Sequence, residues 1–221
     1  MKPWAMAAVP IKPEYGPTLG RMLEPRWRAA GRPTRAAVIA GVAALVLLAV
    51  VLVLQLLSST YAHGGRVPFA FKYKGLYRAA PDPGAYVKIQ SLDAAGAPRY
   101  SYEVYPLTLA PYAGSPSGAL PIYASAYIAR LRARSQAFVL RGEGKTRVNT
   151  VPGYQVLYTE LLDGREMFGR DVLLVPPREG AREGVVIAML NAADATREVK
   201  APSEVASLGV LLRPLKTFTF G

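Results

Sequence analysis

An unbroken apolar run near the N-terminus constrains what this chain can fold into more than any other feature. Residues 36–57 read AAVIAGVAALVLLAVVLVLQLL, and Gln55 is the only polar residue among them. At about 1.5 Å per residue, a helix of this length spans roughly 33 Å, which matches the apolar core of a bilayer. A helix buried in a soluble protein is rarely apolar on every side over such a length. The run therefore predicts a single transmembrane helix.

The charges beside this run predict its orientation. Seven basic residues precede it against two acidic ones, Glu14 and Glu24, whereas three basic residues lie in the twenty positions after it. Basic residues beside a first membrane helix tend to stay in the cytoplasm. We therefore expect a cytoplasmic N-terminus and an extracytoplasmic C-terminal domain. Residues 1–35 contain six prolines, a density that favours a disordered basic cytoplasmic tail.

A cleaved signal peptide is the competing interpretation of a basic leader followed by an apolar run. The apolar run is too long for it, the leader is longer than usual, and the best cleavage site, Thr60-Tyr61-Ala62, is poor. The chain has no cysteine, which excludes lipoprotein modification and disulfides. We therefore predict a retained signal anchor. The excess of arginine over lysine, with abundant alanine and glycine, is typical of a GC-rich bacterial gene.

Beyond the run, small and polar residues 58–66 predict a linker, and residues 67–221 predict one exported domain. Its first half contains three strand patterns, a loop rich in Pro, Gly and Ser at 111–121, and a helix. The strands are expected at 69–77, 85–91 and 100–107. The helix is expected at 122–136, with Pro121 at its first position and Ala124, Ile128 and Leu131 on one face.

The second half of the domain carries stronger strand signals. We expect strands 137–140 and 146–151 around a glycine-rich turn at 142–144, a break at Pro152-Gly153, a hairpin of 154–161 and 167–175, and a buried central strand at 184–190. Asp163-Gly164 is the dipeptide that best accepts the positive φ angles of a tight hairpin turn. From Pro202 onwards, an apolar stripe predicts a C-terminal helix. The stripe consists of Val205, Leu208, Leu211, Leu212 and Leu215.

This order of elements indicates an α+β domain in which helices cover an antiparallel sheet. It resembles the Mog1/PsbP-like fold, which is also found in exported actinobacterial lipoproteins. The resemblance covers residues 67–221 and depends on element order, on GYQVLYTELLDGREMFGRDVLLVP at 153–176, and on the closing strand and helix. Proteins of this fold are mostly assembly factors, extrinsic subunits or binding modules without catalytic activity, so the resemblance implies a non-enzymatic role.

No residue pattern predicts a catalytic, cofactor-binding or metal site. His63 is the only histidine and lies in the expected linker, where no scaffold would orient it. Gly144-Lys145-Thr146 resembles the end of a phosphate-binding loop, but Val139 stands where that motif needs glycine. The glycines at 114 and 118 have the spacing of a nucleophile elbow, but Pro116 occupies the place of the serine.

Two carboxylate pairs could meet around the predicted hairpin. These are Glu160 with Asp163, and Glu166 with Asp171. Because Arg165 and Arg170 lie beside them, exposed ion pairs are the simpler interpretation, and a glycosidase-like or cation site is the alternative.

Surface charge is more informative about partners. From Ser58 onwards the chain has 20 Lys and Arg against 13 Asp and Glu. One basic cluster is a candidate surface for anionic lipid, an anionic wall polymer or an acidic protein, while a solvated face that binds nothing is equally open. Nucleic acid is not an expected partner outside the cell. The cluster consists of Arg130, Arg132, Arg134, Arg141, Lys145 and Arg147.

Together these features predict a single-pass, membrane-anchored, non-enzymatic binding or assembly module of the bacterial cell envelope. One alternative is an accessory subunit of a larger membrane complex, whose helix packs through the small residues Ala37, Ala40, Gly41 and Ala44. A second alternative is a carboxylate-dependent envelope hydrolase.

Overall fold

The structure, a computed structural model, describes residues 31–56, 58–135 and 137–221. The chain divides into two compact units, Met1–Leu56 and Leu57–Gly221. The predicted cytoplasmic tail lies mostly outside the described residues. Residues 32–35, which we assigned to that tail, belong to a helix instead.

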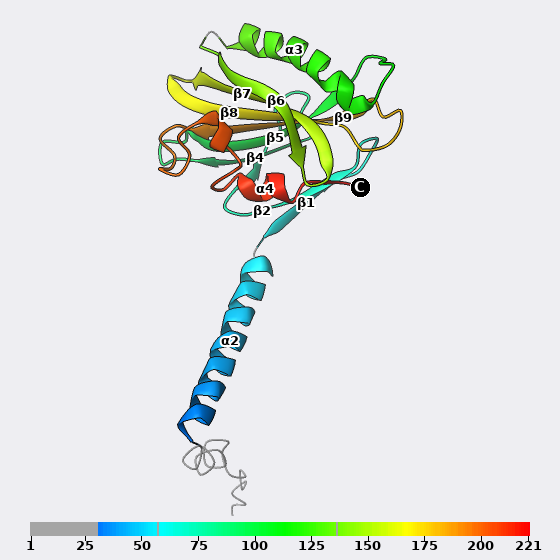
Figure 1. Ribbon diagram of the computed structural model, residues 1–221. Coiled ribbons are helices and arrows are strands. Elements are labelled where there is room, and N and C mark those ends of the chain that lie inside the picture. Colours follow the sequence, from blue (N-terminus) through cyan, green and yellow to red (C-terminus); the bar gives the residue numbers. More distant parts are fainter. Residues whose placement is uncertain (1–30, 57, 136) are drawn as a thin grey trace, which may run out of the picture. The chain divides into compact units, whose positions relative to one another are not determined.

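The first unit contains helix α2, Arg32–Leu56 (Figure 1). It begins four residues before the apolar run because Pro33 fits the first helical turn, where its missing N–H would have no partner anyway. Within the part of the chain that the structure describes, α2 is the one helix long and apolar enough to cross a membrane. The predicted apolar helix is therefore present.

The second unit is built on a seven-stranded antiparallel sheet in the order β3-β4-β5-β9-β8-β7-β6 (Figure 1). β9 lies between β5 and β8, which confirms the prediction of a buried central strand. The strands are β3 Tyr77–Ala79, β4 Val87–Leu92, β5 Pro98–Thr108, β6 Val139–Val148, β7 Val151–Leu162, β8 Arg165–Leu174 and β9 Glu183–Ala192.

Helix α3, Pro116–Arg134, packs on β6, β7 and β8 on one face of this sheet. Its residues Ala124, Ile128 and Leu131 are buried, as their spacing on one face of the helix predicts. The helix begins at Pro116, inside the segment that we expected to be a loop, and Pro121 lies within it. Pro121 is the sixth residue of the helix, so it removes one backbone hydrogen bond and crowds the carbonyl of Ser117, but the helix continues through it to Arg134.

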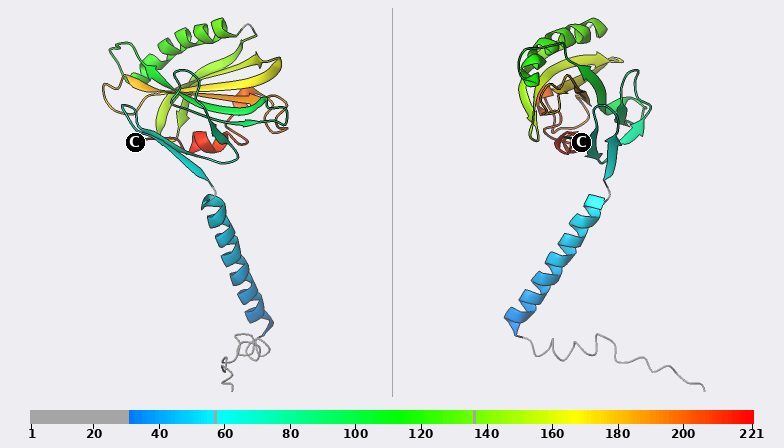
Figure 2. Two further views of the ribbon diagram at one scale, coloured as in Figure 1. Left: turned by 180° about the vertical axis from the view of Figure 1, so that it is seen from behind. Right: turned by 90° about the vertical axis from the view of Figure 1, so that its right-hand side faces the viewer.

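A second sheet of three strands covers the other face, as Figure 2 shows. Its strands are β1 Ser59–His63, β2 Phe69–Tyr73 and β10 Thr219–Phe220, and β2 pairs with both of the others. The short helices η1, Pro202–Glu204, and α4, Leu212–Lys216, lie in the same half of the domain. Phe69, Phe71, Tyr102 and Phe218 are fully buried between the layers.

The predicted linker is wrong for residues 59–63, because they form β1 in register with β2 from Ser59 opposite Tyr73 to His63 opposite Phe69. Tyr61 lies 5.4 Å from the ring of Phe71, and His63 lies 4.3 Å from the ring of Tyr86. The alternation of these two rings with small residues is a strand pattern that the polar composition concealed. His63 is thus held by the domain rather than lying free in a linker.

Two predicted breaks in the hairpins are also wrong. β6 runs continuously through Gly142–Gly144 with a bulge between Leu140 and Gly142, and the turn follows at Asn149, which has φ 53°. β7 runs through Pro152 and Gly153, where a Cβ on Gly153 would lie 2.7 Å from the carbonyl oxygen of Leu173. Glycine here therefore permits close strand packing instead of ending a strand.

The hairpin turn is confirmed, with φ 52° at Asp163 and 81° at Gly164. The predicted C-terminal helix is wrong, because positive φ angles at Ala206 and Gly209 interrupt it and leave only α4. Leu208, assigned to the apolar stripe, is 45% exposed. The predicted strand 69–77 likewise divides into β2 and β3 around Gly75, which has φ 73°.

A pair of soluble fragments tests whether β1 belongs to the domain. A fragment from Ser58 keeps β1, whereas one from Gly64 loses its hydrogen bonds to β2 and the contacts of Tyr61 with Phe69 and Phe71. We expect the shorter fragment to unfold with a free energy lower by about 2 kcal/mol, since each aromatic pair contributes about 0.5–1.5 kcal/mol. Urea denaturation measures the difference. Equal stabilities would show that β1 is dispensable.

Candidate functional site

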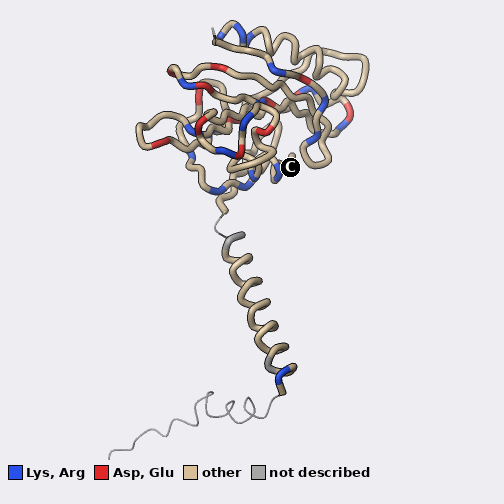
Figure 3. The backbone as a smooth tube through the Cα atoms, turned by 60° about the vertical axis from the view of Figure 1, so that its left-hand side comes forward, with Lys and Arg blue, Asp and Glu red and all other residues tan. Residues whose placement is uncertain are grey.

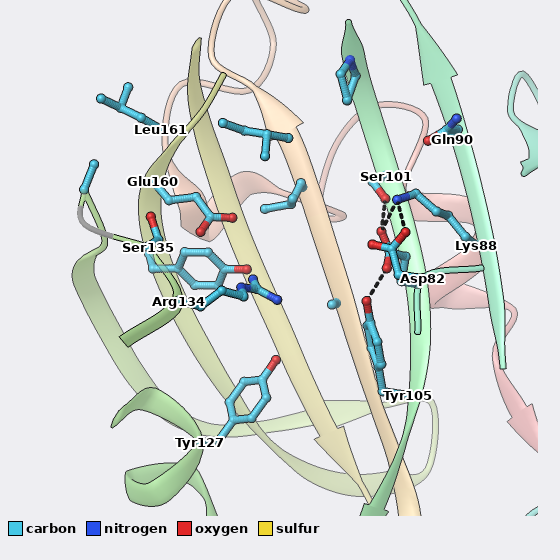
Figure 4. Close-up of a pocket in the computed structure, with 17 residues that line it drawn as sticks. Asp82, Lys88, Gln90, Ser101, Tyr105, Tyr127, Arg134, Ser135, Glu160 and Leu161 are labelled. Carbon is cyan, nitrogen blue, oxygen red and sulfur yellow. Dashed lines mark hydrogen bonds and ion pairs between the residues drawn. The ribbon is translucent and has the colours of Figure 1, made fainter. Parts of the chain in front are cut away.

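The sheet face that α3 covers also contains an open cavity of about 630 Å³, which we call the cleft. One wall comes from α3 and β7, the other from β4 and β5, and β9 supplies the floor with Ala188 and Leu190 (Figure 4). Because α3 packs on β6, β7 and β8, it leaves β4 and β5 uncovered, and the small side chain of Ala188 deepens the floor between them.

The β4–β5 wall is organised around the buried carboxylate of Glu103. Ser101 Oγ donates a hydrogen bond of 2.8 Å to Glu103 Oε1, and the Tyr105 hydroxyl donates one to Oε2. Alternate residues of a strand point to the same face, so these three side chains of β5 all reach the cleft. Lys88 Nζ lies 3.1 Å from Glu103 Oε1 and 2.8 Å from Asp82 Oδ1. Burial alone would lower the pKa of Lys88, but its two carboxylate partners outweigh burial and raise it.

The opposite wall is backed by Asp171, whose side chain is fully buried and does not itself line the cleft. Tyr127 donates a hydrogen bond of 2.7 Å to Oδ2, and Tyr158 donates one of 3.2 Å to Oδ1. Gly169 makes this possible, because a Cβ at its position would lie 2.3 Å from the ring of Tyr158 directly opposite it. Burial raises the pKa of Asp171 to about 7, although the two phenols and the charge of Arg134 act to lower it.

Glu160 lies beside this group and differs from it in having no partner. The residue is 6% exposed, lines the cleft, and makes no hydrogen bond or ion pair with any described residue. Figure 4 shows its carboxylate pointing into the cleft with no bond drawn to it. Burial raises the pKa of Glu160, and the charge of Arg134 acts in the opposite direction.

Arg134 is the cation of this wall. Its exposed side chain ends α3, and its guanidinium points into the cleft (Figure 4). Like Glu160, it has no hydrogen-bond or ion-pair partner in the described part of the chain. The cleft is thus lined by the compensated carboxylate of Glu103 and by two charged groups, Glu160 and Arg134, that have no partner among the described residues. The compensated Asp171 is buried next to it, bonded to two phenols of the lining.

The structure does not gather the six predicted basic residues into one patch. Arg130 lies on α3 with its guanidinium 5.2 Å from the ring of Tyr123, and Arg132 is exposed on the same helix. Arg134 points into the cleft. Arg141 donates a hydrogen bond to Thr159 and lines a smaller cavity with Lys200 and Pro202.

The remaining two basic residues, Lys145 and Arg147, are exposed on β6. Figure 3 shows basic and acidic positions interspersed over the domain. No described contact therefore marks the six residues as a single binding surface, and their role in binding an anionic surface stays a prediction.

The two predicted carboxylate pairs do not meet in the expected way. Glu160 points into the cleft while Asp163 is exposed in the hairpin turn. Glu166 lines the smaller cavity with Arg141, whereas Asp171 bonds with Tyr127 of α3. The structure instead places Glu160 and Asp171 close enough for the charge of Glu160 to act on Asp171.

The predicted arginine partners of these carboxylates are also wrong. Arg165 pairs with Asp93 at 2.7 Å and with Asp194 at 2.6 Å. Arg170 donates hydrogen bonds to the carbonyl of Val205 and the hydroxyl of Ser207.

The other sequence motifs have structural explanations. His63 stacks on Phe69 with ring centres 5.0 Å apart. Gly144-Lys145-Thr146 lies inside β6 rather than in a loop, and Pro116 begins α3. Among the described residues, no group of three or more His, Cys, Asp or Glu side chains is placed to hold a metal ion.

The architecture of the domain is that of the Mog1/PsbP-like fold, as the sequence resemblance implies. Its structure is similar to that of LpqN from Mycobacterium tuberculosis, which is involved in cell envelope biogenesis. The two share 12% identity over 74% of this chain and 91% of LpqN, with a TM-score of 0.50. PsbP from Synechocystis sp. PCC 6803 shares 14% identity over 74% of this chain and 92% of its own, with a TM-score of 0.48.

At this level of identity the similarity to LpqN concerns the fold. No protein-family model and no curated protein sequence matches the chain.

The raised pKa of Asp171 gives a testable dependence of stability on pH. Its pKa is about 7 in the folded protein against an ordinary value of 3.8, so the folded state binds this proton more tightly than the unfolded state. The contribution of Asp171 to the free energy of unfolding therefore falls as pH rises from about 4 to about 7. We expect Asp171→Asn to remove this loss, gaining roughly 2–3 kcal/mol relative to wild type between pH 5 and pH 8.

Urea denaturation of the fragment from Ser58 to Gly221 at both pH values measures the effect. Asp163→Asn, in the exposed turn, is the matched control and should follow the wild-type profile. The assignment would be contradicted if the two variants shared one profile.

Proposed function

We propose that this protein is a membrane-anchored, non-enzymatic binding module of the bacterial cell envelope, and that the cleft is its binding site. The observation that carries the proposal is the carboxylate of Glu160, which is nearly buried, points into open space and has no partner among the described residues. An ionised group without a partner destabilises a fold. Its position in a cavity of small-molecule size supports a role in binding.

The apolar helix supports the anchor. The residues of α2 from Arg32 to Val53 have the length and hydropathy of a membrane span. The basic residues concentrated before it favour a cytoplasmic N-terminus and an extracytoplasmic domain. The fold similarity to LpqN, itself involved in cell envelope biogenesis, supports a role in the envelope.

The hydrogen bonds of the cleft favour binding over hydrolysis. A carboxylate-dependent hydrolase uses two carboxyl groups that both reach the substrate. Both oxygens of Glu103 accept hydrogen bonds, and both oxygens of Asp171 accept hydrogen bonds from the phenols of Tyr127 and Tyr158. This leaves Glu160 as the carboxylate without an internal partner. The hydrolase is therefore the weaker alternative.

An accessory subunit of a larger membrane complex is the other alternative. It would require α2 to pack against partner helices through its small residues, Ala37, Ala40, Gly41 and Ala44. Exchanging α2 for an unrelated membrane span distinguishes the two, because a tethered module keeps its function and a packed subunit loses it. A contact with anionic lipid, wall polymer or a protein through the exposed Arg130, Arg132, Lys145 and Arg147 would be additional to either role.

Alkaline carbonate extraction of membranes tests the anchor. We expect the full chain to remain in the membrane pellet, and Leu45→Arg with Leu48→Arg to release it, since each arginine at a helix centre costs about 2.5–3.5 kcal/mol. Ile122→Arg with Leu208→Arg makes the same change at exposed positions of the domain and should leave the protein in the pellet. Wild-type protein in the supernatant would contradict the anchor.

Obstruction of the cleft tests the binding site. The full chain, purified from its own membranes in mild detergent, should carry a small molecule that native mass spectrometry detects. Ala188→Trp fills the floor of the cleft and should abolish this added mass, while Ala94→Trp in the exposed β4–β5 turn should retain it. The proposal fails if the wild-type chain carries no small molecule, or if the obstructed variant carries the same one.

A further inference from the structure

The geometry points to a small organic amine as the ligand of the cleft, with its ammonium group bound by Glu160. This inference rests on the proposed function and names the chemical class of its ligand. A positively charged N–H donor is what the carboxylate of Glu160 lacks, because no described residue donates a hydrogen bond to it. Ammonium–carboxylate hydrogen bonds are among the stronger ones that proteins form.

The charges around the cleft favour a cation over an anion. Three carboxylates line it, from Asp82, Glu103 and Glu160, against the two cations Lys88 and Arg134. Lys88 is already shared between Asp82 and Glu103. The surrounding domain is basic, with 20 Lys and Arg against 13 Asp and Glu from Ser58 onwards, so this acidic cleft contrasts with its surroundings. Attraction of a cation is stronger in such a partly buried site than in water.

Aromatic groups on the same wall would complete the site. Tyr127 and Tyr158 line the cleft and donate their hydroxyl groups to Asp171. Tyr158 is fully buried, whereas the half-buried Tyr127 keeps part of its side chain exposed. Faces of such rings attract ammonium groups within about 6 Å. The volume of about 630 Å³ lies within the range of sites for small molecules.

Removing the charge of Arg134 distinguishes a ligand that binds through an amine from one that binds through an anion. The positive charge of Arg134 acts on Glu160, and the two side chains form no ion pair. If the ligand is an amine, Arg134 competes with it for Glu160, so removing its charge should tighten binding. If the ligand offers an anion, Arg134 would hold that group, and removing its charge should weaken binding.

Three probes with the same five-carbon chain separate the ligand classes. Cadaverine carries ammonium ends, pentanediol carries hydroxyl ends and glutarate carries carboxylate ends. Isothermal titration of the full chain in detergent, at one ionic strength, should show binding of cadaverine and none of the other two. Binding of glutarate, or of pentanediol as tightly as cadaverine, would overturn the inference.

Matched variants connect this preference to Glu160. Glu160→Gln should weaken cadaverine binding by at least about tenfold, as expected for loss of a charged hydrogen-bond partner. Glu166→Gln removes the same charge from an exposed residue that lines the smaller cavity and should leave binding unchanged. Arg134→Gln should tighten binding. Unchanged binding in Glu160→Gln, or weaker binding in Arg134→Gln, would also overturn the inference.

A measurement of stability separates weaker cadaverine binding in Glu160→Gln from unfolding of the variant. Glu160→Gln removes a nearly buried charge without a partner, so its melting temperature should equal or exceed that of wild type. The two proposals fail separately. A carried ligand without an amine would refute the ligand class and keep the binding site, whereas an added mass insensitive to Ala188→Trp would refute the site itself.

Discussion

One helix is too narrow to cover a face of a seven-stranded sheet. The part of the face that it leaves uncovered determines where the cleft lies and which side chains line it. Seven strands at about 4.8 Å spacing make a face roughly 30 Å across, while a helix with its side chains is about 10 Å wide. α3 lies on the β6–β8 side and leaves β4 and β5 uncovered. Side chains on the uncovered part of this face must tolerate water, and here they are the polar residues of β5 that form one wall of the cleft.

The two walls meet this demand differently. On β5, Glu103 accepts hydrogen bonds from Ser101 and Tyr105 of the same strand and forms an ion pair with Lys88. The negative charge of this wall is therefore balanced by residues of the wall itself. On the other side, two phenols donate hydrogen bonds to Asp171, while no described residue donates one to Glu160. A buried charge that lacks a partner lowers stability, so the same feature that makes the cleft a candidate binding site weakens the empty domain. Binding of a complementary group would restore this stability.

Local signals in the sequence predicted much of the fold. The apolar run of α2, the apolar face of α3, the Asp163-Gly164 turn and the apolar strand β9 each depend on neighbouring residues and are present in the structure. The errors lie where distant contacts decide. Glycines that suggested a turn in β6 belong to a strand held by β7, and β1 forms because β2 pairs with it.

The cleft could not be predicted in the same way. Its unpaired carboxylate comes from β7, its floor from β9 and its other wall from β4 and β5. The sequence offered one signal. Ser101, Glu103 and Tyr105 occupy alternate positions of a predicted strand, so they lie on one face of it. This strand, β5, pairs with a neighbour on each side. Polar side chains on one face of such a strand indicate that the face is open to solvent or hydrogen-bonded.

Strand β6 lies at the edge of the seven-stranded sheet, where a strand from another copy of the domain could pair with it. It is ten residues long and pairs with β7 on one side, so its other side could receive a strand from another molecule. Charged residues stand at every second position from Arg141 to Arg147, and three of the four are basic. Charged side chains repeated along an exposed edge strand disfavour the addition of another strand. These residues therefore protect the domain from aggregation through its longest open edge, whether or not they bind anything.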